Sequence, residues 1–366
     1  MIHELEIKVP SVGESSYKIA IGAGVLPSLW PRIRAAFDRH RPFVITDANV
    51  VAAGHFDALV GERNVPHFVI TPPGEVSKTI GTGVAIIEAM EGAYLGRDTV
   101  VVALGGGTVG DIAGFAAAVF KRGVPVVQIP TTTLAQADSA VGGKTGVDST
   151  VSKNAFGAFW YPAAVYVDVA TLSTLDERQY RAGLVESVKH ALIADATYFQ
   201  FLEDHLDAIL AREPEVLATI ARYNCTIKGR VVEADPTEKN QRRMLNYGHT
   251  IGHAVESASH YELLHGECVA IGIMAAGLIE AEVGLSESGR LDRIAAMFEK
   301  LGVPVKLPAD MDDNTLIDIL KHDKKAVDKW PKFVLMARLG QVHCLDGQYA
   351  VEVGRDVIER VLRQLR

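Results

Sequence analysis

The sequence predicts an α/β N-terminal nucleotide-binding domain with a parallel, non-standard Rossmann-like sheet, followed by a mainly α-helical C-terminal domain. The chain has 366 residues, more than the roughly 250–300 that usually share one hydrophobic core. Its first half alternates short β-branched runs with helical patterns, an order typical of a parallel sheet covered by helices. After about residue 178 an apolar periodicity of 3.6 residues dominates. We therefore expect two domains, at 1–178 and 179–366.

The expected strands are short. The segment TVVVAL at 99–104 is apolar on both faces, as a strand inside a parallel sheet should be. Further strands are expected at 42–46, 67–70, 124–129 and 164–169, with a helix at 78–90 between them. In the second half, helical periodicity covers 178–210, 213–233, 242–259 and 266–283, and a β signal returns only at 332–337.

Charge and composition argue against several classes of protein. The net charge is −8, which argues against nucleic acid or an anionic membrane as a partner. No apolar run reaches the roughly 18 residues of a membrane-spanning helix, and the charged first segment lacks the apolar core of a signal peptide. These features predict a cytoplasmic protein. Cys225, Cys268 and Cys344 form no C-x-x-C pair, so we expect neither a disulfide framework nor a cysteine zinc site, and burial for each.

A glycine-rich turn follows the expected strand at 99–104. Gly105, Gly107 and Gly110 match G-x-G-x-x-G and lead, through Asp111, into a helical pattern. Glycines let the backbone approach a pyrophosphate, which the amides at the start of the helix can bind. The acid that usually follows about 20 residues later is missing, because the next strand ends in Pro-Thr-Thr, so an ordinary Rossmann dehydrogenase is not indicated. A tight turn that only packs helix on sheet is the alternative.

A second glycine-rich region carries charged side chains. The segment DSAVGGKTG at 138–146 places Asp138 and Lys144 around two glycines, and Lys153 and Asn154 follow. Ammonium groups and exposed amides in such loops are typical of phosphate binding. A solvated loop is the alternative.

The segments NYGHTIGH at 246–253 and HGE at 265–267 predict a metal site. His249 and His253 are four residues apart, on one face of a helix, and His265 opens another helical pattern. Neutral imidazoles suit Zn²⁺, and a catalytic zinc takes three protein ligands. Glu186 is a further candidate ligand, because a carboxylate in an otherwise apolar helix is costly unless it is paired or metal-bound. The alternative is a surface ion pair between Glu186 and Lys189.

Together these motifs resemble the 3-dehydroquinate synthases. The resemblance runs from about residue 74 to about residue 340, and its segments occur in order along the chain. They are PGEVSK, GGGTVGD, KRGVPVVQIPTTTLAQADSAVGGKTG, KNAFGAFWYP, RAGLVESVKH, RRMLNYGHTIGHAVE, LHGECVAIG and HDKK. So many ordered matches make chance an implausible explanation.

The resemblance implies one site built from both halves of the chain. Zinc, or Co²⁺ in its place, would be held by Glu186, His249 and His265. Catalytic roles would fall on His253, Lys189, Glu238 and Asn246. NAD contacts would fall on Asp47, Glu75, Lys78, Gly105, Gly106, Gly107, Gly110, Asp111, Thr131, Thr132, Lys144, Lys153, Thr171 and Thr174. Substrate contacts would fall on Arg122, Asp138, Lys144, Asn154, Lys189, Lys228, Arg242, Asn246 and Lys324, with Lys325 as a less favoured alternative to Lys324. Arg122 would reach the phosphate bound to a neighbouring subunit of a homodimer.

The implied substrate is a small phosphorylated sugar acid, 3-deoxy-D-arabino-heptulosonate 7-phosphate. NAD-mediated oxidation, phosphate elimination, reduction, ring opening and aldol closure would turn it into 3-dehydroquinate, in the shikimate pathway of aromatic amino acid biosynthesis. Asn246, His253 and the GGKTG loop favour this branch over the related 2-deoxy-scyllo-inosose and 2-epi-5-epi-valiolone synthases, whereas 148–152 and 235–241 are less typical. Two further hypotheses compete with a cyclase: a metal-dependent polyol dehydrogenase, which needs no cage of cations, and a non-catalytic binding protein.

Overall fold

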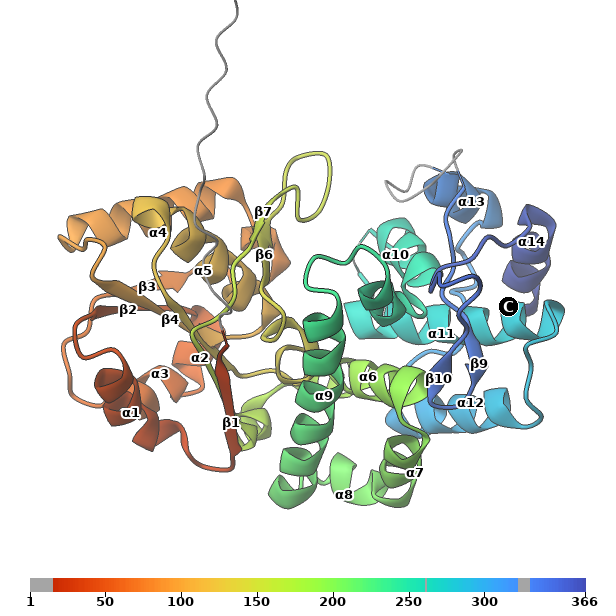
Figure 1. Cartoon of the computed structure of the whole chain (residues 1–366), viewed down its shortest axis with the longest axis horizontal. Coiled ribbons are helices and arrows are strands. Elements are labelled where there is room, and N and C mark those ends of the chain that lie inside the picture. The colour runs from red at the N-terminus through yellow and green to blue at the C-terminus, as the bar shows by residue number, and fades with distance from the viewer. Residues whose placement is uncertain (1–15, 261, 322–329) are drawn as a thin grey trace, which may run out of the picture.

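The computed structural model describes residues 16–260, 262–321 and 330–366. Figure 1 shows a sheet flanked by helices in the first half of the chain and a group of helices in the second half. Lys324 and Lys325 lie outside the described residues.

Six parallel strands form the sheet, in the order β1-β8-β5-β4-β2-β3. Their bounds are Lys18–Gly22 (β1), Arg41–Asp47 (β2), His67–Ile70 (β3), Thr99–Gly105 (β4), Val126–Pro130 (β5) and Ala164–Asp168 (β8). Five of them confirm the strands that the sequence predicts, to within two residues. The edge strand β1 is not among the predicted strands.

Helices cover both faces of the sheet, because successive side chains of a strand point to opposite faces. On β4, Val101 and Ala103 pack against α4 and α5, whereas Val100 and Val102 pack against α1 to α3. The bounds of these helices are Leu29–Ala36 (α1), Ala48–Ala52 (α2), His55–Val60 (α3), Ile80–Gly92 (α4) and Gly107–Val119 (α5). The predicted parallel α/β architecture is confirmed.

An antiparallel hairpin stands where the sequence predicts a glycine-rich loop. It consists of β6 (Lys144–Val147) and β7 (Phe156–Phe159). A Cβ added at Gly114 of α5 would lie 2.3 Å from Cγ2 of Thr145, so a glycine is needed where β6 lies on this helix. The hairpin depends on that tertiary contact, which the local sequence does not indicate.

The second half is mainly helical, as predicted, with two short strands. The bounds are Glu177–Ala194 (α6), Ala196–Asp204 (α7), Leu206–Leu210 (α8), Pro214–Ala234 (α9), His249–Ala258 (α10), His265–Glu282 (α11), Arg290–Leu301 (α12), Asp313–Lys321 (α13), Met336–Arg338 (β9), Gln341–Val342 (β10) and Arg355–Gln364 (α14). The predicted helix at 178–210 is broken into three. Asp195 causes the first break, because its carboxylate accepts the N–H groups of Thr197 and Tyr198 and starts a new helix.

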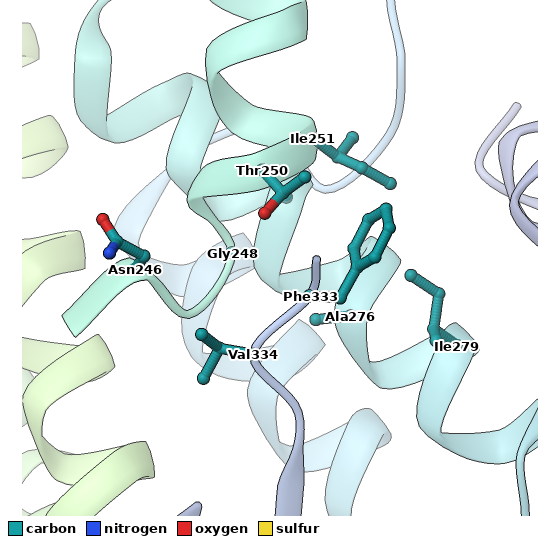
Figure 2. Close-up of a pocket in the computed structure, with 9 residues that line it drawn as sticks. Asn246, Gly248, Thr250, Ile251, Ala276, Ile279, Phe333 and Val334 are labelled. Atoms are coloured by element: carbon teal, nitrogen blue, oxygen red, sulfur yellow. The ribbon is translucent and has the colours of Figure 1, made fainter. Parts of the chain in front are cut away.

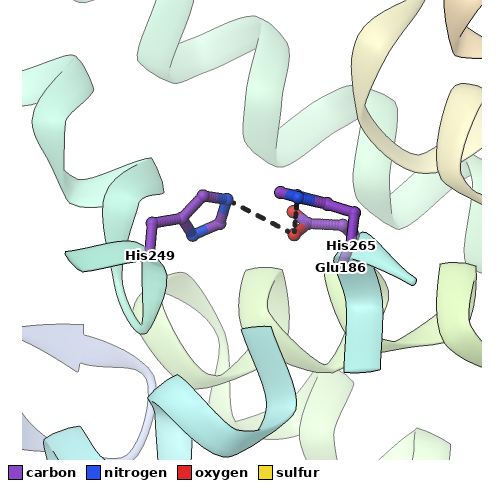
Figure 3. A group of neighbouring side chains, drawn as sticks. All are labelled: Glu186, His249 and His265. Atoms are coloured by element: carbon purple, nitrogen blue, oxygen red, sulfur yellow. Dashed lines mark ion pairs between the residues drawn. The ribbon is translucent and has the colours of Figure 1, made fainter. Parts of the chain in front are cut away.

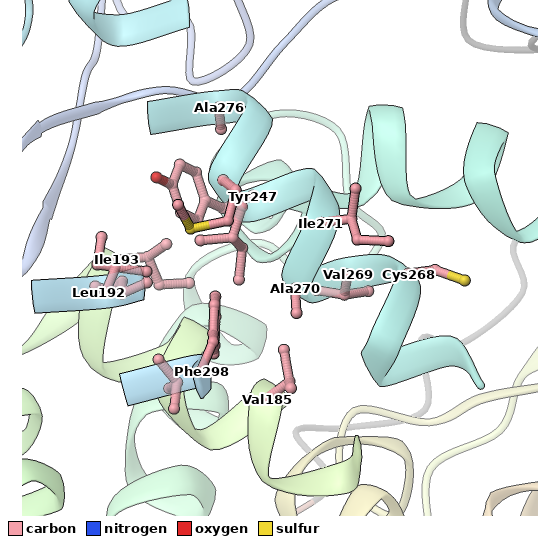
Figure 4. Close-up of a cluster of buried hydrophobic side chains, with 14 of the residues drawn as sticks. Val185, Leu192, Ile193, Tyr247, Cys268, Val269, Ala270, Ile271, Ala276 and Phe298 are labelled. Carbon is pink, nitrogen blue, oxygen red and sulfur yellow. The ribbon is translucent and has the colours of Figure 1, made fainter. Parts of the chain in front are cut away.

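The core of this half surrounds α11, which is apolar on all sides (Figure 4). Figure 4 shows side chains of α11 packed against Val185, Leu192 and Ile193 of α6 and against Phe298 of α12. Such an all-round apolar pattern is typical of a helix buried in a core.

The cysteines differ in exposure. Cys225 and Cys268 are buried, but Cys344 is exposed, so the prediction of burial is wrong for that cysteine. Among the residues that the structure describes, no helix is long and apolar enough to cross a membrane.

Candidate active site

The three predicted metal ligands converge where α6, α10 and α11 meet (Figure 3). Glu186 lies in the middle of α6, and His249 and His265 are the first residues of α10 and α11. Oε1 of Glu186 lies 3.6 Å from Nε2 of His249 and 3.8 Å from Nε2 of His265. These separations are close to the roughly 3.4 Å between two ligands of a tetrahedral zinc ion.

The environment of Glu186 fits a bound cation. Its side chain is 1% exposed, and within the described part of the chain its two carboxylate oxygens accept no hydrogen bond. Its one close ionic neighbour on α6 is the ammonium group of Lys189. A buried carboxylate is unfavourable unless opposite charge and further contacts compensate it. A divalent ion between the carboxylate and the two imidazoles would supply both, and this donor set suits Zn²⁺ or Co²⁺.

The histidine rings are turned so that Nε2 can act as a ligand. Nδ1 of His249 lies 3.0 Å from the carbonyl oxygen of Tyr247, and Nδ1 of His265 lies 3.6 Å from Oε2 of Glu256. Outer contacts of this kind fix the tautomer and the orientation of a ligand ring. Burial, followed by the nearby positive charges, holds the pKa of His249 well below its ordinary value, so its imidazole is neutral.

His253 stands beside this group, with its ring centroid 5.2 Å from that of His249 and 5.9 Å from that of His265. It belongs to a second set of candidate ligands, with Glu256 and His265. We favour the first set, because Glu186 is the buried carboxylate whose oxygens lack hydrogen bonds.

A group of charged residues lies next to Glu186. Asp138, on the π-helical turn Ala135–Ser139, lies 2.7 Å from the ammonium of Lys228, which also donates to the Asp138 carbonyl at 2.6 Å. Nε2 of His190 lies 3.6 Å from the same carboxylate. Burial alone would raise the pKa of Asp138, but Lys228, His190 and Lys189 outweigh burial and hold it well below its ordinary value. The carboxylate is therefore ionised.

Sequence reasoning assigned no role to His190, although it is part of the quoted RAGLVESVKH segment. Its side chain is fully buried, and its Nδ1 lies 3.2 Å from Oδ1 of Asn224. Asn224 in turn donates to Ser187 at 2.8 Å and accepts from Tyr198 at 3.0 Å. The only signal in the sequence is a polar residue inside an apolar helix.

Glu238 connects the two halves of the chain. Its carboxylate contacts the ammonium of Lys144 on β6, and its Oε1 accepts a hydrogen bond from the Asn246 amide at 2.7 Å. Arg242 is 1% exposed, and its guanidinium group donates to the carbonyl of Gly142 at 2.9 Å. A Cβ on Gly142 would collide with that guanidinium group, so the contact needs a glycine. Asn246 also lines a pocket with Ile251 and Phe333, shown in Figure 2. This pocket is mainly apolar and offers few groups to bind an anion.

Several of the predicted nucleotide contacts lie along the carboxyl ends of the parallel strands, whereas Lys144 and Lys153 belong to the β6–β7 hairpin. Asp47 ends β2, Gly105 ends β4, and Thr131 and Thr171 follow β5 and β8. In parallel α/β sheets, ligands bind at this edge. A Cβ on Gly106 would lie 3.0 Å from Thr132, and Thr174 lies 2.8 Å from Nε2 of His55. Gly107 and Gly110 belong to the first turn of α5.

Ion pairs connect the glycine turn with the metal ligands. Lys78 lies 2.7 Å from Asp111, and Lys153 lies 3.4 Å from Glu75 and 2.9 Å from Glu256, which faces His265. Burial alone would lower the pKa of Lys78, but Asp111 and Glu75 outweigh burial and raise it. The ammonium group of Lys78 therefore stays charged beside the turn.

Two predicted substrate residues lie outside this cluster. Arg122 is exposed and follows the far end of α5, about 20 Å along the helix axis from the glycine turn. Asn154 is exposed in the turn between β6 and β7, where its backbone N–H donates to Asp148 at 2.6 Å.

Comparison with known proteins identifies the family. The model of the 3-dehydroquinate synthase N-terminal domain matches residues 68–182, and that of the 3-dehydroquinate synthase C-terminal domain matches residues 183–326. A protein of Symbiobacterium thermophilum named 3-dehydroquinate synthase is 42% identical, over 90% of this chain and 94% of its own length. One of Geobacter metallireducens with the same name is 42% identical, over 92% of this chain and 94% of its own length.

Solved structures show the wider class of cyclases. A 2-deoxy-scyllo-inosose synthase, complexed with carbaglucose-6-phosphate, NAD⁺ and Co²⁺, has a TM-score of 0.85 and 29% identity, over 95% of this chain and 96% of that one. The 2-epi-5-epi-valiolone synthase of Streptomyces hygroscopicus subsp. jinggangensis, with NAD⁺ and Zn²⁺ bound, has a TM-score of 0.84 and 28% identity, over 98% of this chain and 99% of that one. Fold and site thus place the protein among enzymes with the sugar phosphate cyclase architecture. Within that class, the chain belongs to the 3-dehydroquinate synthase family.

The metal assignment can be tested by measuring bound zinc. Glu186→Gln and His249→Ala should each lose most of the zinc that the purified wild-type protein retains, because each removes one of three ligands. His253→Ala is the matched control, since it removes a neighbouring imidazole and should leave the zinc content unchanged. Zinc lost from His253→Ala but kept by Glu186→Gln would assign the ion to the second set.

Proposed function

We propose that this enzyme converts 3-deoxy-D-arabino-heptulosonate 7-phosphate into 3-dehydroquinate and inorganic phosphate, with NAD and a divalent metal ion as cofactors. The observation that carries the proposal is the convergence of the Glu186, His249 and His265 set with buried cations and with the nucleotide edge of the sheet. Relatives 40–46% identical over most of the chain carry the name of this activity.

We assign a set of residues to each cofactor. Glu186, His249 and His265 would hold the metal, and the turn at 105–111 with Lys78 and Asp111 would face the nucleotide. When bound, Zn²⁺ or Co²⁺ supplies Lewis-acid polarisation of a substrate oxygen, and NAD supplies a reversible hydride acceptor.

The remaining residues act as fixed charges and proton carriers. Lys189, Lys228, Arg242 and Lys144 bring four cationic groups to the site, and these suit a substrate that carries a phosphate and a carboxylate. Because these groups are already held by neighbouring residues, they need little rearrangement as charge develops on the departing phosphate. We assign proton transfer to His253 and Glu238, with Asn246 holding the carboxylate of Glu238 in place.

We favour the dehydroquinate branch over the other cyclase branches and over a polyol dehydrogenase. The residues expected of it, Asn246, His253 and the GGKTG loop, are all present, although 148–152 and 235–241 remain less typical. A probable glycerol dehydrogenase of Sinorhizobium meliloti has the same fold, with a TM-score of 0.64 but only 16% identity. A polyol without charged groups would leave Lys189, Lys228 and Arg242 without anionic partners on the substrate.

We also propose a cytoplasmic homodimer, with domains at 1–178 and 179–366, in which Arg122 serves the site of the neighbouring subunit. Lys121, Arg122 and Gly123 have φ angles of 49°, 72° and 110°. Two consecutive left-handed residues with side chains are unfavourable, and such strain is often kept where it has a function. Since α5 separates Arg122 from its own glycine turn, a second subunit is the simplest way to bring its charge to a phosphate.

Product analysis tests the reaction. Incubation of the protein with the heptulosonate phosphate, NAD⁺ and Zn²⁺ should release one phosphate for each 3-dehydroquinate formed, with no net change in NADH absorbance, because the hydride returns to the product. Glycerol should give no NADH under the same conditions. Steady accumulation of NADH with either compound would refute the cyclase assignment.

Mixing two inactive variants tests the shared site. Arg122→Ala and His265→Ala should each lose nearly all phosphate release. If the arginine acts across the interface, a dimer with one subunit of each kind contains one intact site, so an equal mixture should recover about a quarter of wild-type activity after subunit exchange. Arg122→Lys mixed with His265→Ala is a charge-matched comparison. No recovery in a mixture shown to contain mixed dimers would place Arg122 outside the partner's site.

A further inference from the structure

The loop that follows α9 is wrapped around a single carboxylate. Asp235 stands at the end of α9, and its Oδ1 accepts the backbone N–H of Lys239 at 2.9 Å. Its Oδ2 accepts the N–H of Asn240 at 2.7 Å and the N–H of Arg242 at 3.0 Å. One side chain thus fixes the backbone four, five and seven residues further along the chain.

Asp235 is well placed to hold these hydrogen bonds as an anion. It is 9% exposed, and burial alone would raise its pKa. The three backbone N–H groups and the charge of Arg242 outweigh burial, so the pKa lies below its ordinary value. A charged acceptor makes stronger hydrogen bonds to backbone N–H groups than a neutral one.

The loop that Asp235 closes contains a residue in an unfavourable conformation. Glu238 has a φ angle of 59°, in the left-handed region that residues with a side chain rarely adopt. This conformation accompanies the contacts of Glu238 with Lys144 of the first half and Asn246 of the second. A strained backbone persists only where its surroundings hold it, and the hydrogen bonds of Asp235 lie immediately after it.

The same carboxylate also fixes Arg242. The backbone N–H of Arg242 is bound to Asp235, while its guanidinium group donates to the carbonyls of Pro236 at 2.6 Å and Gly142 at 2.9 Å. Pro236 belongs to the loop itself, so the guanidinium position depends on the loop conformation. The Asp235 carboxylate therefore fixes the backbone around both Glu238 and Arg242, through hydrogen bonds to backbone N–H groups.

We propose that Asp235 is a positioning residue for the reaction, which holds the loop at 236–242 in the form that directs Glu238 and Arg242 into the site without contacting the substrate itself. This inference rests on the proposed function, because it assigns the two residues to substrate binding and proton transfer.

The chain offers a matched control for a merely structural role. Asp195 accepts the backbone N–H groups of Thr197 at 2.9 Å and Tyr198 at 3.1 Å at the start of α7. Its replacement removes the same kind of interaction from a helix that supplies no predicted site residue. Asp235→Asn and Asp195→Asn both keep the size of the side chain and remove its charge.

The test compares the two variants as full-length enzyme with NAD⁺ and Zn²⁺. Asp235→Asn should raise KM for the heptulosonate phosphate at least tenfold and should also lower kcat, because Arg242 is assigned to substrate binding and Glu238 to proton transfer. The variant should weaken the binding of inorganic phosphate by a factor similar to the rise in KM. Asp195→Asn should change KM and the affinity for inorganic phosphate less than twofold, even if both variants melt at a lower temperature than the wild type. Zinc content should equal that of the wild type in both variants, since neither touches a metal ligand.

Each outcome decides the proposal. KM and phosphate affinity in Asp235→Asn that match those of Asp195→Asn would show that Asp235 only stabilises the fold. If Asp235→Asn does not fold, Asp235→Glu keeps the charge but moves the oxygens, and a raised KM in that variant supports the proposal while a normal KM refutes it. Phosphate binding by calorimetry needs no turnover, so it tests the loop even if the wild type fails to form dehydroquinate, a failure that would count against the proposed function alone.

Discussion

The buried carboxylate of Glu186 is the constraint on which the rest of the site depends. Its side chain is 1% exposed and sits inside the helix α6, among apolar residues. Removing a carboxylate from water costs several kcal/mol unless opposite charge compensates it. Lys189, one helical turn away, supplies a positive charge, and the imidazoles of His249 and His265 can help to hold a metal ion beside the carboxylate.

Close packing of three helices brings the imidazoles to this carboxylate. A Cβ on Gly266 would lie 1.9 Å from the carbonyl oxygen of Ala182, so the start of α11 rests directly on α6 and places His265 beside Glu186. A Cβ on Gly272 would lie 1.8 Å from the carbonyl oxygen of Gly248, so α10 starts against α11. Glycine at both contacts therefore allows His249 and His265 to reach the same carboxylate, and any side chain there would force the ligands apart.

Much of this arrangement can be predicted from local sequence. The strands at 42–46 and 99–104 are continuous apolar runs, and such runs predict buried parallel strands whatever their partners are. The i,i+4 spacing of His249 and His253 predicts a histidine face, but it does not indicate His265, the other histidine of the favoured ligand set, because His265 comes from another helix. Which histidines meet Glu186 is decided by the packing of α10 on α11, a long-range contact that spacing along the chain does not contain.

The remaining differences have the same cause. The β6–β7 hairpin forms against Gly114 of α5, and the buried position of His190 depends on Asn224 of another helix. Asp235 resembles any loop carboxylate in the sequence, and only the folded backbone shows that three N–H groups converge on it. The family resemblance supplied residues that local patterns could not, such as Lys228 and Arg242, and the structure buries both in one charged cluster.

The most direct test of the metal centre is anomalous diffraction at the zinc absorption edge, from crystals grown with Zn²⁺ and NAD⁺. A single strong peak should lie between Oε1 of Glu186 and the Nε2 atoms of His249 and His265. A peak bound instead by His253 and Glu256, with Glu186 contacting only Lys189, would contradict this assignment of the site.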